Sequence, residues 1–294
     1  MQHRLHRLAH PSGRLLYLDT LLFSIAYLVV GIVAGFLGGM LGIGGGVVIV
    51  PALIVIFDAF DLVAHGAPGG NGTTLTAVGT SLASIIFTSA AAARVQIRAG
   101  MVEWSVVRGW TPFLIVGSYA AGFLAAMLSL ELLRLLIGAF LLFVATVMLT
   151  SWKPAPHRAL PGRLLGGLLS SIGGLISGVA GIGGGNVVVP TLVYHNVPVH
   201  RATATASTLG LPIALAGALG YIHRGWFDTQ LSEGFLGYVY LPALAAIVLA
   251  TVVTAPIGVR AAHRIAPVPL RRAFGVLLVI VSVRMFWSAL GSQP

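Results

Sequence analysis

Long uncharged stretches follow one another along almost the whole chain. Seven runs contain no Asp, Glu, Lys or Arg: 20–57, 62–93, 109–130, 135–152, 164–200, 202–223 and 234–259. A transmembrane helix needs about 20 mainly apolar residues, so most of these runs predict one helix each. A last helix is expected at about 270–290, with Arg284 near its end, where a long side chain can reach the membrane interface.

Two of the runs, 20–57 and 164–200, are too long for one helix and short for two, and each has a glycine cluster in its middle. We interpret each as a span joined to a re-entrant segment that returns to its own side of the membrane. The chain is therefore predicted to be an all-α polytopic membrane protein with about eight transmembrane helices and two re-entrant or broken Gly-Pro segments.

The composition agrees with a chain that lies in lipid. Apolar residues make up 57% of the 294 residues and charged residues 8%, and the mean hydropathy is +0.97. Soluble domains carry about 25% charged residues, so this chain cannot cover a soluble surface. The composition therefore excludes a cytosolic enzyme and a nucleic-acid binder, and the absence of cysteine excludes a disulfide scaffold. The net charge of +10 is expected in cytoplasmic loops and against anionic lipid.

The two glycine-rich runs repeat one another. Residues 35–53 read GFLGGMLGIGGGVVIVPAL and residues 174–192 read GLISGVAGIGGGNVVVPTL, with 11 of 19 positions identical. Downstream, Thr80 matches Thr205 at an offset of 125 instead of 139, so the first half carries 14 extra residues. The predicted organisation is a cytoplasmic tail (1–14), a first membrane repeat (15–152), a basic Pro-rich linker (153–163) and a second membrane repeat (164–291).

Basic residues predict the orientation, because the cytoplasmic loops of membrane proteins are enriched in Lys and Arg. If each glycine-rich run returns to its own side, the N-terminus, 94–108, 152–163 and 223–233 face the cytoplasm and hold ten basic residues. The outer side then holds six: Arg134, Arg201, Arg260, Arg264, Arg271 and Arg272. We therefore predict that both termini are cytoplasmic. The count also favours four spans in each half, which makes the repeat parallel, whereas five spans make it inverted.

The repeated Gly-Pro segments are the first candidate for a binding site. Consecutive glycines and a following proline unwind a helix, and the N–H groups of the unwound backbone and the next helix N-terminus bind anions. In transporters, paired broken helices place the substrate between the two halves. The alternative is close helix packing, which we expect for the flanking Gly31, Gly35, Gly39, Gly174 and Gly178. The predicted binding residues are Gly44, Gly45, Gly46 and Pro51 in the first half and Gly183, Gly184, Gly185, Asn186 and Pro190 in the second.

Hydroxyl residues follow each Gly-Pro segment. Thr80 and Ser81 lie in TAVGTSL, and Thr205 and Ser207 lie in ATATAST. These side chains are candidates to line the cavity and donate hydrogen bonds to an oxyanion. The alternative is a hydrogen bond to the carbonyl four residues earlier in the same helix.

Acidic residues lie only at the ends of the predicted spans: Asp19, Asp58, Asp61, Glu103, Glu131, Asp228 and Glu233. No carboxylate in mid-membrane is available for a cation site or a proton relay. We see no nucleophile–base pair and no metal-ligand cluster, so we expect no enzyme, no metal and no cofactor. A neutral cavity with basic rims suits a small anion.

The doubled motif GIGGGxxxVP, with a threonine-containing helix after each copy and a basic stretch between the halves, resembles the sulfite exporter TauE/SafE family. The resemblance covers about 20–290 and implies an inner-membrane permease that moves sulfite, sulfoacetate or related anions outward. It implies a substrate site at the two motifs and in the Thr80 and Thr205 regions. One departure is that ATATAST differs from AVGTSL, so the two half-sites are not equivalent.

The function predicted from these features is a secondary transporter that exports small sulfur-containing oxyanions. Its partners are then a small anionic substrate and the lipid bilayer, and not nucleic acid. An anion channel, or a permease for another small organic or inorganic anion, is the alternative.

Overall fold

The computed structural model describes residues 13–60, 71–150, 162–226, 234–262 and 268–290. The first half contains α1 (Gly13–Leu41), α2 (Gly46–Phe60), α3 (Gly72–Arg98), α4 (Trp104–Met127) and α5 (Leu130–Leu149). The second contains α6 (Arg163–Ala180), α7 (Gly185–Tyr194), α8 (Val199–Trp226), the short hairpin β1 (Phe235–Leu236) and β2 (Val239–Tyr240), α9 (Leu241–Ala262) and α10 (Val268–Leu290).

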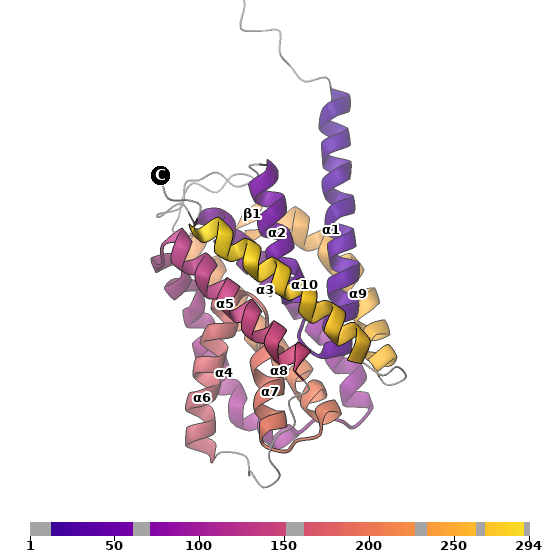
Figure 1. The fold of residues 1–294 in the computed structure, drawn as a ribbon, viewed down its shortest axis with the longest axis vertical. Helices are drawn as coiled ribbons and strands as arrows, with labels where there is room; N and C mark the ends of the chain where they lie inside the picture. Colours follow the sequence, from indigo (N-terminus) through magenta and orange to yellow (C-terminus); the bar gives the residue numbers. More distant parts are fainter. Residues whose placement is uncertain (1–12, 61–70, 151–161, 227–233, 263–267, 291–294) are drawn as a thin grey trace, which may run out of the picture.

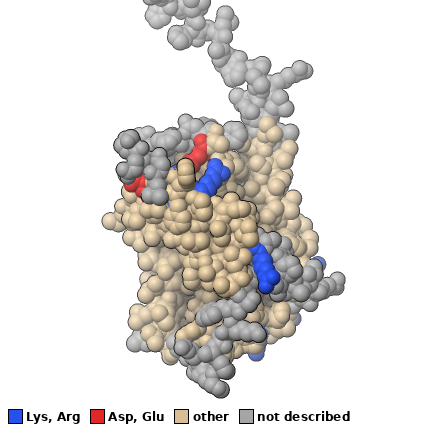
Figure 2. All heavy atoms as spheres, viewed as in Figure 1, with Lys and Arg blue, Asp and Glu red and all other residues tan. Residues whose placement is uncertain are grey.

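The described helices confirm an all-α polytopic membrane protein (Figure 1). Six of them are long and apolar enough to cross a membrane within the described residues. Most of the face shown in Figure 2 is uncharged, as a surface in contact with lipid requires. The N-terminal tail up to residue 12 and linker residues 153–161 lie outside the described residues, as do Asp61, Asp228 and Glu233.

Both glycine clusters break their helices where the sequence predicts a break. Between α1 and α2, Gly42, Gly44 and Gly45 have positive φ angles, and Gly181 and Gly183 repeat this between α6 and α7. The helices that follow the breaks have 15 and 10 residues. At about 1.5 Å per residue, neither reaches across a hydrocarbon core of about 30 Å. Each helix pair is therefore a hairpin with its tip inside the protein.

Helices that match in the repeat run antiparallel to one another. In the pair α3 and α8, Gly79 packs beside Tyr221 and Gly210 packs beside Ser89. In the pair α5 and α10, the Ser282 hydroxyl donates to the Gly138 carbonyl at 2.8 Å, and Gly275 lies beside Leu149. The two halves are thus inverted relative to each other, and the described residues of each half contain five helices. The preference for a parallel repeat with four spans, which rested on charge counting, is wrong.

The inverted halves fit together through small residues. α1 packs parallel to α9, with Gly31 against Ile247 and Gly39 against Ala255. α6 packs parallel to α4 in the same way, with Gly178 against Ala121. A glycine every fourth residue brings two helix backbones close together. The packing interpretation of these flanking glycines is therefore confirmed.

The two ends of the molecule are named here the Gly72 end and the Arg98 end, after the first and last residues of α3. α1 begins at the Gly72 end, at the top of Figure 1, and α6 begins at the Arg98 end, at the bottom. The predicted grouping of loops is wrong, because it places Glu103 and Arg201 on opposite sides of the membrane. Arg201 Nε lies 3.1 Å from Glu103 Oε1, so both residues are at the Arg98 end.

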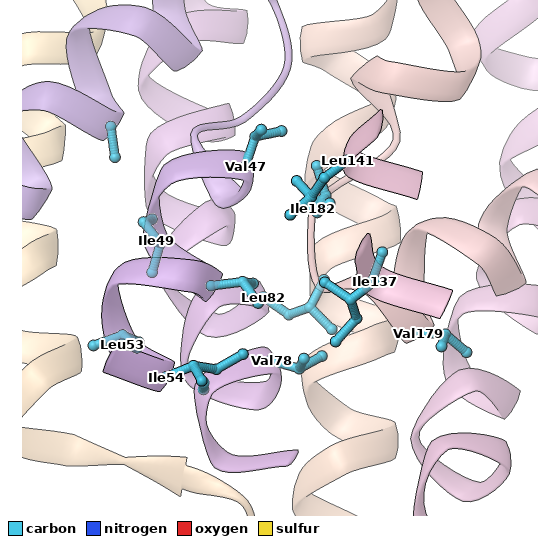
Figure 3. Packing of buried hydrophobic residues seen from close by; sticks show 14 of the residues in the cluster. Val47, Ile49, Leu53, Ile54, Val78, Leu82, Ile137, Leu141, Val179 and Ile182 are labelled. Atoms are coloured by element: carbon cyan, nitrogen blue, oxygen red, sulfur yellow. The ribbon is translucent and has the colours of Figure 1, made fainter. Parts of the chain in front are cut away.

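The buried core surrounds the place where the two hairpins meet. Side chains of α2, α3 and α5 and of the α6–α7 tip interlock there (Figure 3). The labelled members are Val47, Ile49, Leu53, Ile54, Val78, Leu82, Ile137, Leu141, Val179 and Ile182.

Candidate functional site

The tips of the two hairpins touch through their backbones. A methyl group added to Gly46 would meet the Gly181 carbonyl, and one added to Gly185 would meet the Gly42 carbonyl. The two contacts are equivalent, because the inverted repeat relates Gly46 to Gly185 and Gly181 to Gly42. Glycine at both positions is therefore required by packing alone, before any ligand is considered.

The other predicted glycines serve the turns. Gly44 and Gly183 have positive φ angles and both face Ile85, and Gly45, also at positive φ, lies against the Ala34 carbonyl. Gly184 has an ordinary φ of −67° and faces the end of the Ile213 side chain. These positions shape the tips, and none of the four lines the larger cavities described below.

The predicted hydroxyl residues are engaged in structural hydrogen bonds. Thr80 Oγ1 accepts from the Tyr240 amide at 2.9 Å, and Thr205 Oγ1 accepts from the Glu103 amide at 2.9 Å. Each bond joins one half to the other. Ser81 donates to the Gly181 carbonyl at 2.8 Å.

The back-bonding alternative also applies to this group. Thr205 and Ser207 both donate to the carbonyl four residues earlier, at 2.7 and 3.0 Å. These contacts tie helices and halves together, and none of the four predicted hydroxyl residues lines the larger cavities.

A cavity of about 160 Å³ lies beside the second tip and is called the Asn186 cavity here. Its walls come from both halves: the end of α1, the first tip, the last turns of α3, α5 and α9, one side of α7 along its length and the start of α8. Of the predicted site residues, Gly185, Asn186 and Pro190 line it. Pro51 lines a different cavity, described below.

Four polar side chains face the Asn186 cavity: Gln96, Asn186, His200 and Thr203. Gln96 and Asn186 are 3% and 4% exposed. Gln96 Oε1 and Asn186 Nδ2 are buried without a hydrogen-bond partner. His200 is exposed, so the cavity extends from the buried amides to the surface at the Arg98 end. Unpaired buried amides cost folding free energy, which marks a site for a polar ligand or water.

Sequence reasoning missed Gln96 as a site residue. Arg94 and Arg98 flank it, and the three residues were assigned to a cytoplasmic loop. In the structure α3 continues to Arg98, and both arginines are exposed whereas Gln96 points inward. A glutamine between apolar positions at helical spacing was the available signal.

A second cavity of about 390 Å³ lies between α2 and α10 and has mostly apolar walls, Pro51 among them. Asp58 and Ser288 at its rim bind the buried Arg134, with N–O distances of 2.8 and 2.6 Å. Thr74 Oγ1 lies 3.4 Å from Arg134 Nε. Arg134 thus joins α5 to α2, α3 and α10 near the Gly72 end. The described residues contain no group of three or more potential metal ligands.

Comparison with known proteins assigns the chain to a family. The family model of the sulfite exporter TauE/SafE matches residues 27–285. The chain belongs to the TauE/SafE family. It is 31% identical over 272 residues to a probable membrane transporter protein of Haemophilus influenzae, covering 90% of this chain and 98% of that one. It is 29% identical over 279 residues to a probable membrane transporter protein of Methanocaldococcus jannaschii, covering 91% and 97%. No solved structure matches the chain significantly.

TauE/SafE membership makes this protein a multi-pass membrane transporter and not an enzyme. The family assignment from the GIGGG motifs is thereby confirmed. In this TauE/SafE protein the two motifs form the crossing tips, and the Asn186 cavity lies directly beside the second one.

Proposed function

We propose that this TauE/SafE protein is a secondary transporter that exports small sulfur-containing oxyanions such as sulfite or sulfoacetate, and that the Asn186 cavity holds the substrate. The observation that carries the proposal is a cavity built by both inverted repeats at a helix break, with unpaired buried amides on its wall. Transporters of inverted-repeat architecture bind substrate at such a place.

An anion is favoured by the charges around the cavity. The described residues of its wall include no carboxylate, and its buried end lies at the N-terminus of α7, where the helix dipole supplies a partial positive charge. Exposed Arg94, Arg98 and Arg260 lie at the same end of the molecule. A cation would meet no compensating charge here.

The corrected grouping of loops changes the orientation that we propose. Within the described helices and loops, eight basic residues belong to the Arg98 end and four to the Gly72 end, counting each along the helix or loop that carries it. Because basic residues are enriched on the cytoplasmic side of membrane proteins, we propose that the Arg98 end faces the cytoplasm and that the start of α1 and the end of α10 face outside. The cavity opens toward the cytoplasm in this orientation, as loading of an exported substrate requires. The membrane in question is the cell's inner membrane.

An anion channel through the same cavity is the second candidate. A carrier is favoured because the two tips pack backbone against backbone at Gly46 and Gly181, whereas a channel needs a continuous open path. In a carrier, movement of one repeat against the other opens the second side while it closes the first.

Counterflow in proteoliposomes tests the proposal. Vesicles loaded with unlabelled sulfite should take up labelled sulfite with saturable kinetics, and sulfate, thiosulfate and small sulfonates should compete to different degrees. Asn186→Leu should lower the uptake, whereas Thr146→Val, which changes an exposed hydroxyl on α5, should not. Absence of counterflow for every anion would refute the proposal. Flux that does not saturate, together with single-channel currents, would favour the channel.

A further inference from the structure

The Asn186 cavity carries a more specific inference about its ligand. We infer that it selects a singly charged anion that brings its own hydrogen-bond donor, such as hydrogen sulfite, over a doubly charged anion. This inference rests on the proposed function and names the charge state of the substrate. It assigns Gln96 and Asn186 as the residues that distinguish the singly charged anion from the doubly charged one.

The first argument is the charge that the cavity can balance. The described wall contains no Lys or Arg, and His200 at the mouth is its titratable residue. The neighbouring Arg201 already pairs with Glu103 at 3.1 Å. The α7 N-terminus contributes about half of an elementary charge. That suits one negative charge, whereas a second would be desolvated without a counter-charge, at a high cost in free energy.

The second argument is the pair of unpaired amide atoms. In the structure both side chains line the cavity and each leaves one amide atom without a partner: Asn186 Nδ2, which is a donor, and Gln96 Oε1, which is an acceptor. A ligand that satisfies both atoms must carry an acceptor and a donor. Hydrogen sulfite in its hydroxyl form carries both, and the sulfite dianion carries acceptors alone. The Thr203 hydroxyl on the same wall adapts to either role.

A matched pair of probes isolates the hydrogen-bond donor. Isethionate and ethanesulfonate are both permanent monoanions of similar size, and only isethionate has a hydroxyl group. Competition with labelled sulfite in proteoliposomes should show about tenfold tighter binding of isethionate, since a buried acceptor left unpaired costs about that factor in affinity. Equal inhibition by both sulfonates in the wild-type protein would overturn the inference.

A second measurement isolates the charge. At constant total sulfite, uptake should fall as rising pH converts hydrogen sulfite into the dianion, whereas uptake of isethionate should stay level. Isethionate also controls for any effect of pH on the protein, including on the charged groups near the mouth, because such an effect acts on both substrates. Sulfite uptake that stays level, or that changes in parallel with isethionate uptake, contradicts the inference.

The variant Gln96→Leu connects the selectivity to the residue. It removes the unpaired acceptor, so the preference for isethionate over ethanesulfonate should fall from about tenfold to about onefold. Thr146→Val should keep the wild-type preference. An unchanged preference in a folded Gln96→Leu protein would overturn the assignment, and the probe pair in the wild-type protein tests the inference if the variant does not fold. Failure of the wild-type protein to carry any anion would instead refute the proposed function.

Discussion

The Asn186 cavity and the place related to it by the inverted repeat have equivalent backbone arrangements but different side chains. Asn186 matches Val47 at the offset of 139, and the partners at the offset of 125 follow the same pattern. These further matches are Gln96 with Tyr221, Thr203 with Val78, and His200 with Leu75. All four residues on the first-tip side are at most 1% exposed.

The difference shows how a symmetrical scaffold acquires one site. The backbone contacts between the tips are duplicated, from Gly46 against Gly181 to Gly185 against Gly42. The unpaired amides occur on the second-tip side, whereas Val47, the partner of Asn186, lines the second cavity of about 390 Å³, whose walls are mostly apolar. The scaffold therefore depends on both copies, whereas recognition depends on one, and the predictions below separate these two roles.

The largest loss of stability is expected at the two glycines whose backbone contacts are the same at both tips. Gly46→Ala and Gly185→Ala each place a methyl group against backbone atoms of the opposite tip, which cannot move aside. Overpacking of this kind costs about 1–3 kcal/mol or more, so both variants should lose most of the folded protein. The yield of monodisperse protein in detergent and its thermal unfolding measure this.

Gly184→Ala is the matched control for that pair. Its methyl group meets the end of the Ile213 side chain, which can adopt another rotamer, and makes an ordinary contact with the Val188 side chain. The variant should therefore fold. If Gly46→Ala and Gly185→Ala differ widely in stability from each other, the symmetrical crossing is not what these glycines maintain.

Arg134 should contribute more to stability than the residue that matches it in the other repeat. Arg134→Gln removes bonds to Asp58 and Ser288 from a buried position and should lower the free energy of unfolding by about 1–3 kcal/mol. Its repeat partner Arg272 is exposed, and Arg272→Gln should change stability by less than about 0.5 kcal/mol. Equal thermal stabilities of the two variants would show that the Arg134 contacts contribute nothing.

One substitution removes the amide from the second tip and another adds an amide to the first tip. Together they should separate the effect on stability from the effect on transport. Asn186→Val removes an unpaired buried amide and should raise the unfolding temperature while it lowers sulfite counterflow at least tenfold. Val47→Asn buries a new amide and should cost about 1–3 kcal/mol while transport continues in the folded fraction. A Val47→Asn protein that loses transport but not stability would place recognition at the first tip as well.

The sequence was sufficient for the class of fold and for the two helix breaks, because uninterrupted apolar runs and triple glycines act locally. It did not settle which way the second half runs, because hydropathy is the same for a helix in either direction. Charge counting gave the wrong grouping, since it assumed that the segments after the breaks were short excursions from complete spans. Contacts such as Arg201 with Glu103 depend on the inverted packing.

The candidate site was predicted only in part for a similar reason. The motif pointed to the correct tip, and Asn186 stood out as an amide in an apolar repeat. Glycine, however, has the same signature whether it approaches a ligand or another backbone, and here Gly46 and Gly185 approach backbone. Gln96 comes from the other half of the chain, so only the packing of α3 against the second tip brings it to the cavity.

The smallest perturbation tests the placement of the ends on which the whole comparison depends. The chain contains no cysteine, so single cysteines report accessibility without further changes. Ala99→Cys lies at the Arg98 end, and Met127→Cys, at a residue that is 82% exposed, lies near the Gly72 end. Neither should affect stability or transport, because both side chains are exposed.

In intact cells a membrane-impermeant maleimide should label Met127→Cys, and Ala99→Cys should react only after the membrane is opened. The reverse pattern would keep the two ends apart but turn the protein over, so that the cavity would load from outside and the direction of transport would have to be reconsidered. Labelling of both cysteines from the same side would contradict the opposite placement of the two chain segments that flank α4, and with it the assignment of the Asn186 cavity to one side of the membrane.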